Sequence, residues 1–151
     1  MSDIIHRIGI KASPEQVYPA LSTVNGVAGW WTHETTGESK VGGLLTLRFV
    51  NHGKEKGKVD LEVVELDPGK SVRWRVKKGP EEWIGTEVTF SLTQDGDFTV
   101  LAFGHRNWRE PGDFMAHCSM KWATFLLSLR EFVETGAGRP SPHDLKIDTW
   151  N

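Results

Sequence analysis

The chain has 151 residues, the size of one domain, and its formal net charge of −2 gives no basic excess that would indicate a nucleic-acid partner. Its 38% hydrophobic and 25% charged residues are typical of a globular protein, and the first residues contain no apolar run that would predict a secretory signal or a membrane span. The single cysteine, Cys118, excludes an intramolecular disulfide. We therefore expect one cytoplasmic domain over residues 1–151 that binds neither nucleic acid nor a membrane.

The N-terminal part predicts one strand and two short helices. Residues 4–11 alternate apolar and polar side chains, as a strand does. Ser13 is suited to cap a helix that has Pro14 in its first position, and Gln16 completes a capping box. A second short helix is expected to begin near Ser22 and to end at the GWW stretch, residues 29–31.

Five further segments alternate apolar and polar residues, which predicts an antiparallel meander with one dry and one wet face. They are LLTLRFV (44–50), GKVDLEVVEL (57–66), SVRWRVK (71–77), WIGTEVTFSL (83–92) and FTVLAFGH (98–105). The stretch HRNWRE (105–110) reads as a loop, in which Arg106 or Arg109 could meet a ligand carboxylate.

After residue 112 the apolar residues recur at helical spacing. We expect a helix from Asp113, which can cap it, to Thr135, with Gly136 just beyond its end, followed by an irregular tail over residues 137–151. The predicted fold is α+β. A curved six-stranded antiparallel sheet wraps around the long C-terminal helix, two short helices follow the first strand, and an apolar pocket lies between helix and sheet.

Four stretches in this order carry a resemblance to a known family, and they are ASPEQVYPAL (12–21), GWW (29–31), VGGLLTLRF (41–49) and KWATFLLSLREFVETGAG (121–138). The chain resembles the START-like helix-grip (SRPBCC) proteins, and most of all the branch named after the activator of heat-shock protein 90 ATPase homologue. It departs from that branch at Lys121, where glycine is frequent. The resemblance implies a helix-grip fold with a hydrophobic-ligand cavity under the long helix, and it leaves the ligand open because fold does not determine function.

Candidate ligand-binding residues are aromatic or polar side chains that the pattern turns toward this cavity. Of the adjacent Trp30 and Trp31, we expect Trp30 to pack in the core and Trp31 to line the cavity. The other candidates are Phe49, Trp74, Phe90, Phe103, His105 and His117. Each of them could instead be an ordinary core residue. No spacing of residues predicts a nucleophile with its base, a metal site or a cofactor site.

Three functions remain open. The first is a binding domain for a hydrophobic or aromatic small molecule, without catalysis. The second, implied by the resemblance, is a stress-response module that binds a chaperone and regulates its ATPase. The third is a polyketide cyclase-like enzyme or small hydrolase that uses a cavity histidine, His105 or His117. The chain is expected to be a monomer or a homodimer.

Overall fold

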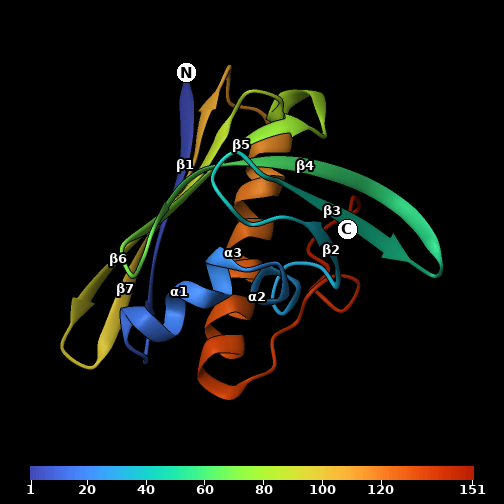
Figure 1. Cartoon of the computed structure of the whole chain (residues 1–151). Coiled ribbons are helices and arrows are strands. Elements are labelled where there is room, and N and C mark those ends of the chain that lie inside the picture. The colour runs from blue at the N-terminus through green and yellow to red at the C-terminus, as the bar shows by residue number, and fades with distance from the viewer.

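The structure, a computed structural model, describes all residues 1–151, and its central feature is a single curved sheet that bends around a long helix (Figure 1). In chain order the elements are β1 (Ser2–Ile10), α1 (Pro14–Ser22), α2 (Val24–Ala28), β2 (Glu34–Gly37), β3 (Leu44–Asn51), β4 (Lys54–Asp67), β5 (Ser71–Lys78), the 3₁₀ helix η1 (Glu81–Trp83), β6 (Glu87–Asp95), β7 (Phe98–Trp108) and α3 (Asp113–Thr135). The strands are antiparallel in the order β1-β7-β6-β5-β4-β3-β2. This arrangement confirms the predicted helix-grip fold.

The sheet has seven strands, so the expected number of six is wrong by one. The additional strand, β2, has the sequence ETTG and pairs with β3 at the sheet edge, where Thr35 lies opposite Leu47. Thr35 is its only buried residue. A four-residue strand without apolar alternation carries no signal that sequence patterning can detect.

Two strand boundaries also differ from the prediction. The segment that begins at Trp83 is not extended there, because Trp83 closes η1 and β6 begins only at Glu87. The predicted loop after His105 is strand as far as Trp108, since β7 continues to pair with β1 up to Ser2 opposite Trp108. Arg106 is held on this strand by Asp3, with 3.3 Å between Arg106 Nη1 and the carboxylate.

The N-terminal helices follow their predicted capping signals. Ser13 Oγ accepts a hydrogen bond from the Gln16 amide at 3.3 Å, and Gln16 Oε1 accepts one from the Ser13 amide at 2.9 Å, which together form the capping box. The short α2 passes very close to α3, because a Cβ atom at Gly29 would lie 2.4 Å from the Phe132 ring. Glycine at position 29 therefore allows the GWW stretch to pack against α3.

The long helix α3 has the predicted bounds, and its apolar face packs against the inner face of the sheet. Its first turn lacks a side-chain cap, since the residue in the cap position is Gly112 and not Asp113. Gly136 ends it with a φ of 89°, the left-handed region that glycine adopts readily. No helix of the structure is long and apolar enough to span a membrane.

The tail after α3 is irregular, as predicted, but it is firmly attached. It turns back past the start of β2, where the Ser141 amide donates to Trp31 O at 2.8 Å and the His33 amide donates to Ser141 O at 3.3 Å. Ser141 and Asp144 are both buried. Residues 137–151 thus cover part of the helix–sheet interface instead of extending into solvent (Figure 1).

Candidate ligand pocket

A partly open pocket of about 600 Å³ lies where α3, the β3–β4 hairpin, the loop containing η1 and the C-terminal tail meet. This volume is within the usual range for small-molecule sites. Its inner wall is aromatic and its rim is largely polar and charged, so one end suits an apolar group and the other suits a charged one. The wall residues with aromatic rings are Trp31, Phe49, Trp83, Phe114, Trp122, Phe125 and Trp150.

Trp31 joins this wall to the core behind it. Its ring lies 4.8 Å from Trp122 and 6.2 Å from Phe49, both in the pocket wall, and it stacks at 5.9 Å on Trp74, which lies outside the wall. Only 2% of Trp31 is exposed. A ligand in the pocket could therefore contact only the small exposed part of this ring.

The neighbouring Trp30 faces the core, as expected. Its indole nitrogen donates to Ala20 O at 2.8 Å, its carbonyl oxygen accepts from Ser128 Oγ at 2.8 Å, and it does not line the pocket. Trp30 thus attaches α1 and α3 to each other, and Trp31 is the ring of the pair that reaches the pocket. Contact between Trp31 and a ligand stays a prediction.

Three predicted candidates, Trp74, Phe90 and Phe103, lie on the inner sheet face but outside the pocket lining. Phe90 is edge-on to Trp74 at 5.1 Å and to Phe103 at 5.4 Å, and each of the three is at most 1% exposed. They are therefore packed core residues and not part of the pocket wall. Alternation identifies the inner face of a strand, but it does not tell where along that face the helix leaves a gap.

His105 is fully buried in a polar chain behind the pocket wall. Its Nδ1 accepts from Trp122 Nε1 at 3.0 Å, and because an indole N–H can only donate, the ring proton must lie on Nε2. Nε2 then donates to Thr86 Oγ1 at 2.8 Å, and this hydroxyl donates to Trp83 O at 2.5 Å. Burial lowers the pKa of His105 to about 3. A neutral His105 with both nitrogens occupied therefore positions two wall residues, Trp83 and Trp122, and does not face the pocket.

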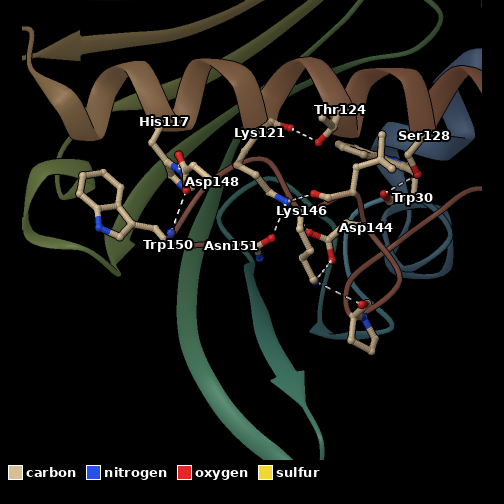
Figure 2. Close-up of polar contacts among 12 residues, drawn as sticks. Trp30, His117, Lys121, Thr124, Ser128, Asp144, Lys146, Asp148, Trp150 and Asn151 are labelled. Atoms are coloured by element: carbon tan, nitrogen blue, oxygen red, sulfur yellow. Dashed lines mark hydrogen bonds and ion pairs between the residues drawn. The ribbon is translucent and has the colours of Figure 1, made fainter.

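His117 does line the pocket, and it ties the tail to α3 (Figure 2). Its Nδ1 lies 2.7 Å from Asp148 Oδ2, and its ring is flanked by Phe114 at 6.2 Å and Trp150 at 5.3 Å. The hydrogen bond from His117 is the main cause that holds the pKa of Asp148 below its usual value. The predicted candidate thus lies at the rim with Nδ1 paired to Asp148 and Nε2 without a hydrogen bond in the protein.

Lys121 makes the second and more buried attachment of the tail. It forms an ion pair with Asp144 and donates to Leu145 O at 2.7 Å and to Asn151 Oδ1 at 3.1 Å (Figure 2). Burial acts to raise the pKa of Asp144, but the hydrogen bond and charge of Lys121 and the charge of Lys146 outweigh it and keep this pKa below its usual value. Lys121 thus attaches the tail to α3.

These tail contacts could not be predicted from sequence patterns. Asp144, Lys146 and Asn151 line the pocket from a segment with no periodic pattern. The only signals were Trp150 near the chain end and the unexpected Lys121. Cys118 also lines the pocket, and burial raises the pKa of its thiol to about 12, so it is protonated and not a nucleophile. No three His, Cys, Asp or Glu side chains gather where they could hold a metal ion.

Comparison with known proteins places this architecture in a family. The family model described as Activator of Hsp90 ATPase homolog 1-like protein matches residues 11–134. The solution structure of the Aha1 dimer from Colwellia psychrerythraea is 45% identical, with a TM-score of 0.78 over 91% of this chain and 100% of that chain. No curated protein matches.

More distant solved structures share the fold alone. The protein SSP2350 from Staphylococcus saprophyticus is 15% identical with a TM-score of 0.73, over 91% of this chain and 95% of that chain. DynU16, from the dynemicin biosynthetic locus, is 22% identical with a TM-score of 0.72, over 91% of this chain and 49% of that chain. The match to most of the chain and the 45% identity to the Colwellia protein show that the chain belongs to the family of activator of Hsp90 ATPase homolog 1-like proteins.

Proposed function

We propose that the protein binds a small molecule with an apolar or aromatic body in the pocket between α3, the β3–β4 hairpin and the tail, and that it does so in the cytoplasm without catalysing a reaction. The observation that carries this proposal is the aromatic wall of a pocket of about 600 Å³. Such rings offer large apolar contact areas at a low cost in side-chain entropy. Carriers and sensors need this kind of site and no reactive group.

The arrangement of the histidines leaves at most one candidate base in the pocket, the Nε2 of His117. General base catalysis needs a basic nitrogen within hydrogen-bond reach of the substrate. Both nitrogens of His105 are used by Trp122 and Thr86, and the Nδ1 of His117 is paired with Asp148. A polyketide cyclase-like or hydrolase reaction, the third function that the sequence left open, would have only the Nε2 of His117 as a histidine base.

The test uses neutral apolar probes, 1-naphthol and 1-decanol, followed by thermal shift and by tryptophan fluorescence. A probe at 100 times its dissociation constant should stabilise the protein by about 2.7 kcal/mol. Phe49→Ala, in the pocket wall, should weaken binding at least severalfold. The matched control Phe98→Ala, at a 46% exposed ring on β7, should leave it unchanged. Absence of saturable binding, or equal binding by both variants, would contradict the proposal.

A second candidate function is an interaction with a heat-shock protein 90 chaperone, within a homodimer or as a monomer. It is favoured by the family description and by the 45% identical Aha1 dimer. Stimulation of the ATPase rate of such a chaperone by the purified protein would support it, and sedimentation analysis would determine the oligomeric state. No change in ATPase rate at saturating protein would rule out this role.

A further inference from the structure

We propose that the ligand of this pocket is an amphipathic acid, whose apolar body packs on the aromatic wall and whose carboxylate is bound at the rim by Lys56 and Lys146. This inference rests on the proposed binding function and specifies the chemical class of the ligand. It follows from the charge of the lining, from which of its cations are already tightly bound by the protein, and from the position of the other cations beside the wall.

The pocket has the opposite charge balance to the whole protein. The chain has a net charge of −2, yet the charged side chains that line the pocket are four lysines and one aspartate. The four lysines are Lys56, Lys58, Lys121 and Lys146. A carboxylate that enters the pocket is therefore attracted by it, whereas a cationic ligand is repelled.

Lys121 cannot hold the ligand while the tail is in place. Its ammonium group already donates to Asp144, Leu145 O and Asn151 Oδ1, and an ammonium group has only three hydrogens to donate. Its side chain is 11% exposed and that of Asp144 is 2% exposed. This pair belongs to the attachment of the tail, and the cation that meets a ligand must be one of the other three.

Two other carboxylates in this region, those of Glu55 and Asp148, are engaged by other partners. Lys56 and Lys58 form no ion pair, although Glu55 is their neighbour, because Glu55 pairs with Arg48 at 3.2 Å. On the tail, Asp148 accepts from His117 at 2.7 Å, and the Asn151 main-chain oxygen accepts from the Ile147 amide. The protein's own carboxylates thus leave part of the positive charge at the rim without a partner.

Lys146 is the weakly paired cation on the tail side of the pocket, where its ammonium also lies 3.5 Å from Pro142 O. Its ammonium lies 3.5 Å from Asp144 Oδ1, at the long end of a hydrogen bond, while Lys121 holds the other oxygen of this carboxylate closely. The Lys146 side chain is 50% exposed and its ion pair with Asp144 is long, so little is lost when its ammonium turns toward a ligand. A second carboxylate beside Lys146 would complete its hydrogen bonds.

Lys56 lies on the opposite side, next to an aromatic wall residue. In the β3–β4 ladder Phe49 pairs with Gly57 and Val50 pairs with Glu55, so Lys56 is the extra residue of a β-bulge. Phe49, Val50, Lys56 and Gly57 all line the pocket. The bulge therefore brings an apolar surface and a cation to the same rim, which is the arrangement that an amphipathic acid requires.

The experiment compares acids with neutral analogues of the same shape by isothermal titration calorimetry at pH 7.5. The probe pairs are 2-naphthoic acid with 2-naphthamide and decanoic acid with 1-decanol. Wild type should bind each acid about tenfold more tightly than its neutral analogue, as expected for two partly exposed charge-assisted hydrogen bonds. In 0.5 M NaCl this preference should decrease, because salt screens exposed charges.

The double variant Lys56→Gln/Lys146→Gln should reduce the preference to about twofold or less, because the acids lose more affinity than the neutral probes do. The control Lys54→Gln/Lys70→Gln removes the same charge from positions outside the lining and should keep the preference. Equal binding of acid and neutral probes to wild type, or the same preference in both double variants, would overturn this inference and leave the proposed binding function intact. No binding of any of the four probes would overturn both.

Discussion

The two ends of the interface between α3 and the sheet are built from the same kinds of residue and differ in how completely they are filled. At one end, Phe90 is surrounded by Trp30, Trp74 and Phe103 with centroid distances of 5.1 to 6.2 Å. At the other end, Phe49 is only partly buried, and residues of the C-terminal tail complete the pocket that it lines. Aromatic residues therefore fill the core at one end and line a pocket at the other, and the path of the surrounding backbone distinguishes the two.

The packed end should respond most strongly to truncation. Phe90→Ala removes a ring that is 1% exposed, and we expect it to lower the free energy of unfolding by about 3–5 kcal/mol through lost burial and the cavity that remains. Urea denaturation followed by tryptophan fluorescence measures this change. A loss below about 1 kcal/mol would mean that the packed end is looser than the structure shows.

The tail should be the next most sensitive part, and its response should be local. Asp144→Ala leaves the ammonium of Lys121 without its buried counter-ion, and we expect it to destabilise the closed tail by about 2–3 kcal/mol. Amide hydrogen exchange should then increase over residues 137–151, while α3 and the sheet keep their protection. Asp67→Ala, at an exposed carboxylate that forms no ion pair, is the control and should leave the exchange of the tail unchanged. Uniform loss of protection would show instead that tail and core unfold together.

His105 should make the stability of the packed core depend on pH. Its pKa is about 3 in the folded protein and 6.5 by default, so between these values the unfolded chain takes up a proton that the folded protein does not. Stability should therefore fall as the pH decreases through this window, by up to about 1.4 kcal/mol per pH unit. His105→Gln, which keeps an acceptor and a donor, should remove this part of the slope in urea denaturation at pH 4 to 7. If the free energy of unfolding of His105→Gln depended on pH as it does in the wild type, other groups would be responsible for this dependence.

Local patterns were sufficient to predict most of the fold. The capping box at Ser13 and the helix from Asp113 to Thr135 depend on residues close in sequence, and both are confirmed. Strand β2 was missed because its pairing with β3 and not its composition makes it a strand. The family match over residues 11–134 confirms the resemblance, and the tail lies beyond that match.

The site was less predictable because it depends on contacts between distant segments. Trp31, Phe49 and His117 line the pocket, and the predicted His105 instead fixes wall residues from behind. Lys121 and Asp144 are 23 residues apart in sequence, and no spacing rule relates them. A pocket that is completed by an irregular tail can be located only once the path of that tail is known.

The smallest expected loss of stability is at the open end of the interface, where Phe49 lies. Phe49→Ala removes the same ring as Phe90→Ala, but from a partly exposed position beside an existing gap, so little burial is lost and no enclosed cavity is created. We expect a loss of about 1 kcal/mol in the free energy of unfolding, measured in the same urea titrations. If Phe49→Ala cost as much as Phe90→Ala, the β3–β4 hairpin would be part of the packed core and the pocket would be closed in solution. A small cost in stability together with a large loss of probe binding would instead show that this ring contributes to a binding site more than to the fold.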